Sequence, residues 1–212
     1  MEHPGTKCGG LLKLALCLTL FAFLLSGCGS DPDLPGLPHE AVVLAFGDSL
    51  TFGTGAKADE SYPAVLQDLI DRRVINAGIP GEVSAEGRRR LPVLLERHEP
   101  ELLLLCHGGN DLLRKRDRER LKANLHAMIG MARERGIPVV LIGVPRPALL
   151  LLESDETYPA VAEKLGVPLE SELLPEILGD TSLKSDPIHP NAAGYRQLAE
   201  GIAELLRDRG AI

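Results

Sequence analysis

The sequence predicts an α/β domain of three layers, α/β/α, around a central five-stranded, mostly parallel sheet. Two observations lead to this prediction. From residue 41 onward, short apolar runs alternate with longer segments of helical periodicity, which is the pattern of successive βαβ units. The run Leu102-Leu103-Leu104-Leu105 carries no polar residue at alternate positions, which is typical of a strand covered by helices on both faces.

The expected elements follow one another along the chain. Strands are predicted over residues 41–46, 74–79, 101–106, 138–143 and 167–169. Helices are predicted over residues 61–72, 84–98, 118–135, 158–164 and 192–209. The first helix has Ser61 as its expected N-cap and Pro63 at an early helical position. Ligands of such open sheets bind beyond the carboxyl ends of the strands, so we expect the chemistry there.

The first 27 residues have the features of an export signal. Lys7 and Lys13 give a basic start, residues 14–25 form an uncharged apolar run, and Ser26-Gly27 supplies small residues for cleavage. A membrane-spanning helix needs about 20 apolar residues, and this run is shorter. We therefore expect residues 1–27 to direct export and to be removed.

The segment Leu25-Ser26-Gly27-Cys28 resembles the lipobox of bacterial lipoproteins, in which the cysteine becomes the lipid-modified first residue. The resemblance implies a lipid anchor at Cys28 in the bacterial cell envelope, facing the periplasm. With Gly29 after the cysteine, it implies the outer membrane in a Gram-negative host. The alternative is an ordinary secretory peptide that ends near a cysteine. Residues 28–40, rich in Pro, Gly and Asp, are the expected flexible tether, and residues 41–212 the folded domain.

The charge of the chain argues against nucleic acid as a partner. The net charge is −7, and without residues 1–27 the chain keeps 21 basic and 29 acidic residues, a net charge of −8. Nucleic-acid binding needs a clustered basic face. The basic residues at 88–90 and 114–120 lie in helical context among acidic ones, and we interpret them as solvated helix surface.

The cysteines predict no internal disulfide. Cys8 and Cys17 are expected to leave with the signal peptide, and the lipobox resemblance implies a lipid on Cys28, so Cys106 is left without an expected partner. Cys106 ends the leucine run and is expected to be a small buried hydrophobic residue.

A serine directly follows the first predicted strand, in the segment Gly-Asp-Ser-Leu-Thr-Phe-Gly of residues 47–53. Ser49 would lie on the turn between strand and helix, where its hydroxyl faces the expected cleft. Gly-Asp-Ser alone is equally compatible with a simple capped turn. The choice between a catalytic serine and a capped turn therefore depends on the other segments.

Polar or glycine-bearing turns also follow the second and third strands. Gly81 lies in the first of these turns, and its lack of a side chain allows backbone N–H groups to approach a ligand closely. The second turn, Gly-Gly-Asn-Asp at residues 108–111, places the amide of Asn110 on the same rim. Asn110 is therefore a candidate donor to a developing oxyanion.

A carboxylate and an imidazole lie three residues apart just before the last helix. Asp186 and His189 stand in the segment Asp-Pro-Ile-His-Pro, whose two prolines stiffen the loop. A general base must lie about 2.6–3.2 Å from the group it deprotonates, and a carboxylate must fix its tautomer. Ser49, His189 and Asp186 are thus candidates for nucleophile, base and orienting carboxylate.

These four segments, in this order, resemble those of the SGNH or GDSL family of hydrolases over roughly residues 42–206. The resemblance implies the flavodoxin-like SGNH hydrolase fold and ester hydrolysis without a metal or organic cofactor. It gives Ser49 as nucleophile, His189 and Asp186 as base and orienter, and Gly81, Asn110 and the Ser49 N–H as oxyanion-hole donors. Single-domain bacterial lysophospholipases, thioesterases and arylesterases are the most similar group.

The chain departs from the pattern of the family in two segments. Glu82-Val83 stands where Asp-Thr is frequent, and His107 stands where an apolar residue or glycine is more usual. His107 either lines the cleft beside Asn110 or packs behind it. Asp111 is expected to bond the backbone. The run Leu149–Leu152 forms either a buried helix or strand extension, or a wall for an acyl chain.

Several functions stay open at this point. The first is hydrolysis of small-molecule or lipid acyl esters, including lysophospholipids and acyl thioesters. The second is a carbohydrate O-acetyl esterase or an acetyltransferase with the same residues, because a fold does not determine the acceptor. The third is a lipoprotein that only binds acylated ligands. A metal site of His107, Asp111, Asp186 and His189 lacks short ligand spacing beyond the last two.

Overall fold

The computed structural model describes Met1, residues 33–146 and residues 153–212. The expected signal peptide, the lipid site at Cys28 and the run Leu149–Leu152 lie outside the described residues. Within the described part of the chain, no helix is both long and apolar enough to cross a membrane.

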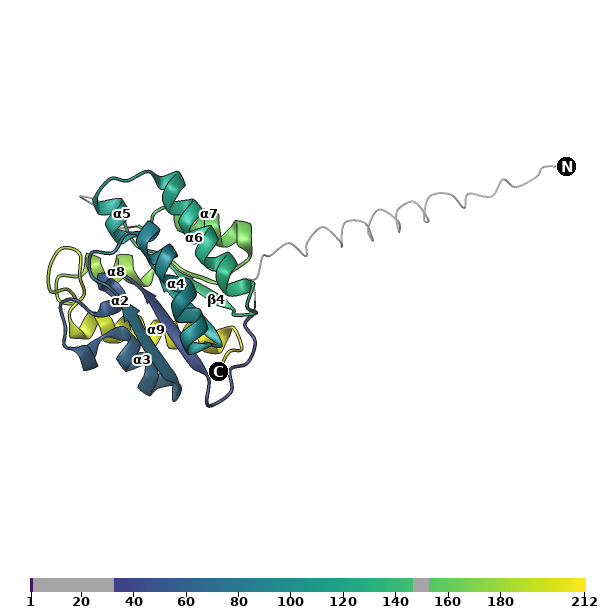
Figure 1. Cartoon of the computed structure of the whole chain (residues 1–212), viewed down its shortest axis with the longest axis horizontal. Helices are drawn as coiled ribbons and strands as arrows, with labels where there is room; N and C mark the ends of the chain where they lie inside the picture. The colour runs from purple at the N-terminus through teal and green to yellow at the C-terminus, as the bar shows by residue number, and fades with distance from the viewer. Residues whose placement is uncertain (2–32, 147–152) are drawn as a thin grey trace. The chain divides into compact units, whose positions relative to one another are not determined.

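Five strands form one sheet in the order β2-β1-β3-β4-β5 (Figure 1). They are β1 (Val42–Gly47), β2 (Arg73–Gly78), β3 (Leu102–Cys106), β4 (Val139–Ile142) and β5 (Leu169–Glu170). All neighbouring strands run parallel, and Gly47 pairs with both Gly78 and Cys106. This order is that of the flavodoxin-like doubly wound sheets, so the predicted fold class is confirmed.

The helices form a layer on each side of the sheet (Figure 1). The bounds are α2 (Ser49–Phe52), η1 (Ala58–Glu60), α3 (Tyr62–Ile70), α4 (Ser84–His98), α5 (Gly109–Leu113), α6 (Arg118–Arg133), α7 (Thr157–Leu165), α8 (Leu173–Gly179) and α9 (Ala192–Asp208). In one layer α9 packs against α3 and α8, and in the other α6 packs against α4 and α7. Ser49 and Asn110 therefore follow β1 and β3, the neighbouring strands at which the winding reverses.

The strand interiors are buried as their composition predicts. Every residue of β3 and β4 is buried, so helices cover both faces there. Cys106 is fully buried, as expected for a small hydrophobic residue, and burial raises the pKa of its thiol. The thiol is therefore chemically quiet.

Some local predictions differ from the structure. Helices α5 and α8 were not expected, because α5 begins at a pair of glycines and α8 contains Pro175. The last strand is Leu169–Glu170 and not residues 167–169. Ser61 occupies the N-cap position of α3, but its hydroxyl donates to the carbonyl of Ala58 at 2.8 Å and does not cap the helix.

The folded part of the chain begins before residue 41. Leu34 and Leu37 are buried, with 8% and 7% of their surfaces exposed. Their backbone N–H groups donate to the carbonyls of Arg209 and Ala211 at 2.9 and 2.7 Å. The prediction of a flexible tether over residues 28–40 is thus wrong for residues 34–37, because two leucines in a Pro-rich segment find apolar cover beside the C-terminus.

Candidate active site

Ser49 is placed by the sharp passage from β1 into α2. It is the first residue of this short helix, and Asp48 is the N-cap, whose carboxylate accepts from the N–H of Leu50 at 3.2 Å. Asp48 is fully buried, and burial raises the pKa of its carboxyl above the ordinary value, although the amides of Leu50 and Gly109 lower it. The turn therefore holds Ser49 at the carboxyl end of β1.

The loop before α9 is closed by its own backbone. The N–H of Ser185 donates to the carbonyl of His189 at 2.9 Å, and Asn191 donates to Leu183 at 2.9 Å. Gly55 allows a neighbouring turn to approach this loop, since its φ is +101° and a Cβ there would lie 2.1 Å from Ser185 Oγ. These contacts fix the backbone of the loop that carries His189.

Asp186, His189 and Ser49 form one chain of hydrogen bonds. His189 Nε2 lies 2.9 Å from Ser49 Oγ, and His189 Nδ1 lies 2.7 Å from Asp186 Oδ2. Asp186 Oδ1 accepts the backbone N–H groups of Ile188 and His189 at 2.8 and 2.9 Å. Partial burial raises the pKa of Asp186, but the hydrogen bonds from His189 and Ile188 outweigh it and hold the pKa below its ordinary value. The carboxylate is thus ionised at neutral pH and can orient the imidazole.

Asn110 and Gly81 lie on adjacent turns after β3 and β2. Asn110 is the second residue of α5, and its Nδ2 donates to the carbonyl of Glu82 at 3.0 Å. Gly81 has a φ of +80°, and the N–H of Glu82 donates to the carbonyl of Ile79 at 3.2 Å. A positive φ at the third residue of a turn, after proline, is the geometry that requires glycine. The Gly81 turn is therefore joined to Asn110 through Glu82.

A pocket of about 290 Å³ opens at Ser49. Ser49, Asn110 and His189 line it, whereas Asp186 and Gly81 are not among its lining residues. The rest of the lining is largely apolar and includes Leu50, Leu113, Val144, Leu178 and Ile188, with the cations Arg146 and Lys184. An apolar pocket with a few polar groups beside a serine suits an acyl group and its carbonyl.

The four residues considered as a metal site do not converge on one point, because His107 and Asp111 contact other side chains than Asp186 and His189 do. His107 is fully buried and its Nε2 lies 3.0 Å from Glu82 Oε2, so it packs behind the cleft and does not line it. Asp111 accepts from the backbone N–H and hydroxyl of Ser84 at 2.7 and 2.9 Å, as the expected backbone contact requires. No group of three His, Cys, Asp or Glu side chains within the described ranges is arranged to hold a metal ion.

The sequence did not reveal the role of Arg90. It was interpreted as solvated helix surface, but its guanidinium binds both oxygens of Glu82 at 2.9 and 2.6 Å and lies 4.3 Å from the centre of the Phe46 ring. It also donates to the carbonyl of Ala77 at 3.1 Å. The only sequence signal near Arg90 was that Glu82 and His107 both depart from the family pattern. The sequence does not show that these two residues meet, or that Arg90 contacts Glu82.

A serine on a buried turn, an imidazole at hydrogen-bond distance and a carboxylate behind it form the arrangement that serine hydrolases use. Comparison with known proteins identifies the family. Residues 45–197 match the GDSL-like lipase/acylhydrolase family. The chain belongs to this family, and it is a carboxylic ester hydrolase.

The relatives cover nearly the whole domain. Esterase TesA of Pseudomonas aeruginosa is 32% identical over 196 residues, which is 88% of this chain and 98% of the relative. Thioesterase 1/protease 1/lysophospholipase L1 of Escherichia coli strain K12 is 31% identical over 78% of this chain and 83% of the relative. The crystal structure of TesA superposes with a TM-score of 0.71 at 31% identity, covering 79% of this chain and 99% of that one.

Proposed function

We propose that the protein cleaves carboxylic acyl esters through an acyl-enzyme, with Ser49 as nucleophile, His189 as base and Asp186 as its orienter. The observation that carries this proposal is the unbroken hydrogen-bond chain from Asp186 to His189 to Ser49, which ends in an apolar pocket. Distances of 2.7 and 2.9 Å are those that proton transfer requires.

The mechanism follows from the protonation states. His189 Nδ1–H donates to the Asp186 carboxylate, so Nε2 is free to accept the Ser49 proton. Ser49 Oγ attacks the ester carbonyl and a tetrahedral intermediate forms. It collapses when His189 returns the proton to the leaving alcohol or thiol. Water then attacks the acyl-enzyme by the same route and releases the carboxylic acid.

The oxyanion is assigned three donors. The N–H of Ser49 lies at the first turn of α2, the N–H of Gly81 lies on its turn, and Asn110, which lines the pocket, offers its side-chain amide. The Asn110 amide carries two N–H groups, and one of them is occupied by the Glu82 carbonyl. The second remains for the substrate. Loss of one such donor typically lowers turnover about 10²–10³-fold.

The test is hydrolysis of p-nitrophenyl esters from acetate to palmitate by the chain from Gly29 to Ile212, with chelator present. Ser49→Ala should abolish turnover and labelling by a fluorophosphonate probe, whereas the control Ser171→Ala should keep both. Labelling that survives Ser49→Ala would show another nucleophile. No activity on any ester would favour a polysaccharide acetyl ester, an acetyltransferase or a binding role.

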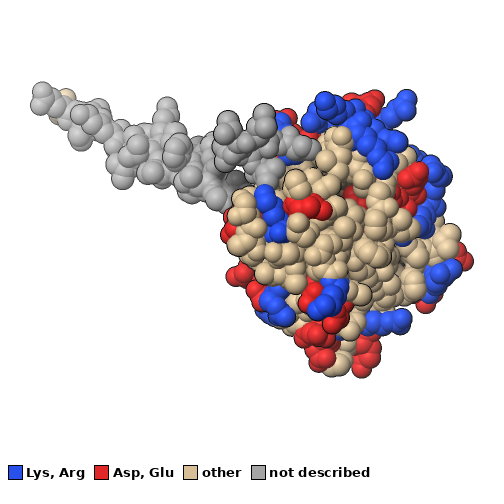
Figure 2. Space-filling view, turned by 90° about the vertical axis from the view of Figure 1, so that its left-hand side faces the viewer, with Lys and Arg blue, Asp and Glu red and all other residues tan. Residues whose placement is uncertain are grey.

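Positive charge beside the pocket supports a substrate class. A groove that shares Leu113 and Arg146 with the pocket is also lined by Lys115, Arg116 and Arg118. Figure 2 shows Lys and Arg gathered along the upper and right margins of its view, although the chain is acidic overall. Such a groove attracts anions. We therefore propose acyl esters with a phosphate-bearing leaving group as preferred substrates.

This preference has a direct test. A 1-acylglycerol 3-phosphate should have a KM at least about tenfold below that of the uncharged monoacylglycerol of the same chain length at low salt, and the gap should narrow as salt screens the groove. Lys115→Ala with Arg116→Ala should close the gap. Lys122→Ala with Lys164→Ala, which remove the same charge outside the groove, should not. Equal KM values for both substrates would rule out the preference.

We further propose that the enzyme is lipid-anchored at Cys28 in the bacterial cell envelope and faces the periplasm. The lipobox-like segment at residues 25–28 supports this, and Gly29 favours the outer membrane in a Gram-negative host. Residues 29–33 then lie between the lipid and the first buried leucine. Cys28→Ser should leave an unprocessed or soluble form, measured by detergent partition and mass spectrometry of the N-terminal peptide. A soluble wild-type protein without lipid would contradict the anchor.

A further inference from the structure

Glu82, Arg90 and His107 form a polar cluster behind the pocket, in which Glu82 and His107 are buried and Arg90 is partly buried. The Glu82 carboxylate accepts from Arg90 Nε at 2.9 Å and from Arg90 Nη2 at 2.6 Å, and His107 Nε2 lies 3.0 Å away. Only 7% of the Glu82 surface is exposed, and His107 is fully buried. None of the three residues lines the pocket that contains Ser49. They therefore act on the reaction only through other residues.

The cluster joins the ends of three strands. Arg90 Nη2 also donates to the carbonyl of Ala77 in β2 at 3.1 Å and lies 3.4 Å from the carbonyl of Gly47 in β1. His107 directly follows β3, and the hydroxyl of Tyr158 donates to its carbonyl at 2.9 Å. The three turns that carry Ser49, Gly81 and Asn110 are thus connected through side chains of the cluster.

Glu82 links this cluster to the assigned oxyanion donors. Its backbone carbonyl accepts from Asn110 Nδ2 at 3.0 Å, and its N–H closes the turn that contains Gly81. The side chain is held by Arg90 and His107, so the backbone of residue 82 has little freedom to move. A shift here would displace Gly81 and rotate the amide of Asn110 together.

The surroundings are shaped for the imidazole of His107. A Cβ on Gly87 of α4 would lie 2.3 Å from His107 Nε2, so the helix leaves this space only because residue 87 is glycine. The carboxylate of Glu82 accepts hydrogen bonds but donates none, so His107 carries its proton on Nε2. His107 and Glu82 are also among the residues at which the chain departs from the family pattern, together with Val83, and His107 and Glu82 contact each other.

We propose that Glu82 and His107, locked by Arg90, act as one positioning unit that holds Gly81 and Asn110 in place for the oxyanion. The proposal rests on the proposed function, because it concerns the donors assigned there. It adds positioning residues that do not touch the substrate.

The test compares variants by kcat, KM and the rate of fluorophosphonate labelling, whose product also places an oxygen among the donors. Glu82→Gln and His107→Leu should each lower kcat and the labelling rate about tenfold, while KM changes less than twofold. His107→Gln, which keeps an N–H donor at nearly the same position, should restore kcat to within about threefold of wild type. The double variant should be no slower than the slower single variant, because residues that act as a unit are not additive.

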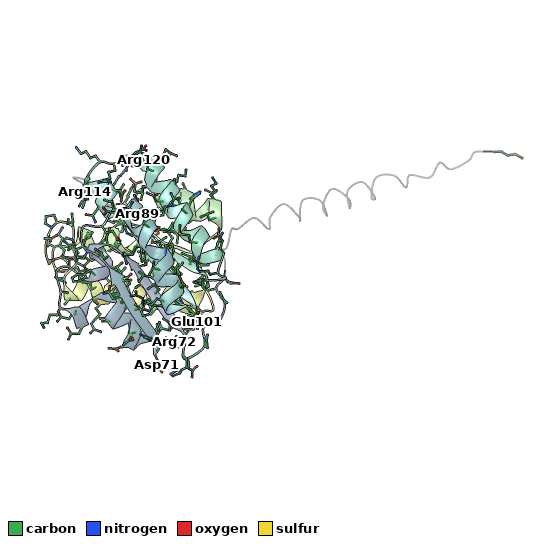
Figure 3. All side chains as sticks on the ribbon, in the orientation of Figure 1. Asp71, Arg72, Arg89, Glu101, Arg114 and Arg120 are labelled. Carbon is green, nitrogen blue, oxygen red and sulfur yellow. The ribbon has the colours of Figure 1, made fainter. Side chains whose placement is uncertain are left out.

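Arg72→Met is the matched control. Arg72 is also partly buried and donates to the backbone carbonyls of Ile70 and Leu37, at the end of the molecule opposite Arg114 (Figure 3). This variant should lose stability without losing kcat. Circular dichroism and thermal unfolding report the folded fraction of each variant, and if Glu82→Gln does not fold, His107→Leu carries the same test.

Two results separate the inference from the function on which it rests. If folded Glu82→Gln and His107→Leu keep wild-type kcat while Ser49→Ala abolishes activity, the positioning unit is wrong and the proposed function stands. Multiplying effects in the double variant, or failed rescue by His107→Gln, would also overturn the unit. If Ser49→Ala retains activity, the proposed function itself fails.

Discussion

Asp48 illustrates how one buried carboxyl shapes the turn that presents Ser49. Its Oδ1 satisfies the N–H of Leu50 at the start of α2, and the side chain has almost no contact with solvent. Asp48→Ala removes this cap, so we expect the free energy of unfolding to fall by about 1–2 kcal/mol. Asp48→Asn keeps the acceptor and should lose less. Denaturant unfolding of both variants measures the difference, and equal losses would mean that the cap is unimportant.

Glu82 predicts a specific dependence of stability on pH. Burial raises its pKa, but the contacts with His107 and Arg90 outweigh that effect and hold the pKa at about 2. A carboxyl whose pKa is lower in the folded state stabilises the fold above its unfolded pKa, near 4.3, and loses this contribution as the pH falls toward the folded value. The contribution of Glu82 is therefore complete above about pH 5.

The prediction concerns a difference between variants. Between pH 5 and pH 2.5 the unfolding free energy of the wild type should fall by about 2 kcal/mol more than that of Glu82→Gln. Glu163→Gln, at an exposed position of α7, should follow the wild type. Urea unfolding at a series of pH values measures this. Parallel curves for wild type and Glu82→Gln would show that Glu82 has an ordinary pKa.

At the scale of elements, α4 and α6 each contain a glycine that serves as a probe of packing. Glycine is worse than alanine in a helix interior by about 1 kcal/mol, so alanine is normally stabilising there. A Cβ on Gly130 in α6 meets nothing within 4 Å, whereas a Cβ on Gly87 in α4 meets the buried ring of His107. The same substitution should therefore have opposite effects in the two helices.

We expect Gly130→Ala to raise the free energy of unfolding by about 0.5–1 kcal/mol. Gly87→Ala should lower it by about 1–3 kcal/mol, because the buried His107 ring would have to shift away from the added methyl group. Thermal unfolding of the two variants gives both signs. Stabilisation by Gly87→Ala would mean that the His107 side chain is free to move, and it would weaken the positioning unit.

The features that were predicted depend on residues close together in the sequence, whereas those that were missed depend on contacts between distant residues. The alternation of strands and helices is visible in local periodicity. Three of the four polar segments follow β1, β2 and β3, so their meeting follows from the topology of a parallel sheet, whereas the fourth, at residues 186–190, precedes α9. Helix α5 was missed because Gly108-Gly109 resembles a turn. The contact of Asn110 in this helix with the Glu82 carbonyl is long-range and leaves no local pattern. The contact of Glu82 with His107 spans 25 positions, and no local pattern marks it.

At the scale of the whole molecule, the two ends of the described domain hold each other. Leu34 and Leu37 lie in a segment rich in Pro and Gly, whose composition predicted a solvated tether. Composition describes only the segment itself, whereas burial depends on the surface that the rest of the chain offers. Here that surface is the end of the chain after α9, and the carbonyls of Arg209 and Ala211 accept the two leucine N–H groups.

This pairing predicts that residues 34–37, which lie within the expected tether, are needed for stability. A buried leucine side chain contributes about 1.5–3 kcal/mol, so a chain that begins at Glu40 should be less stable than one that begins at Gly29, on the order of 3 kcal/mol. Leu34→Ala with Leu37→Ala in the longer chain should reproduce most of that loss, whereas Pro32→Ala should not. Denaturant unfolding compares the chains. If they are equally stable, residues 34–37 belong to the tether after all. If they differ, only residues 29–33 would separate a lipid anchor at Cys28 from the first buried leucine, Leu34.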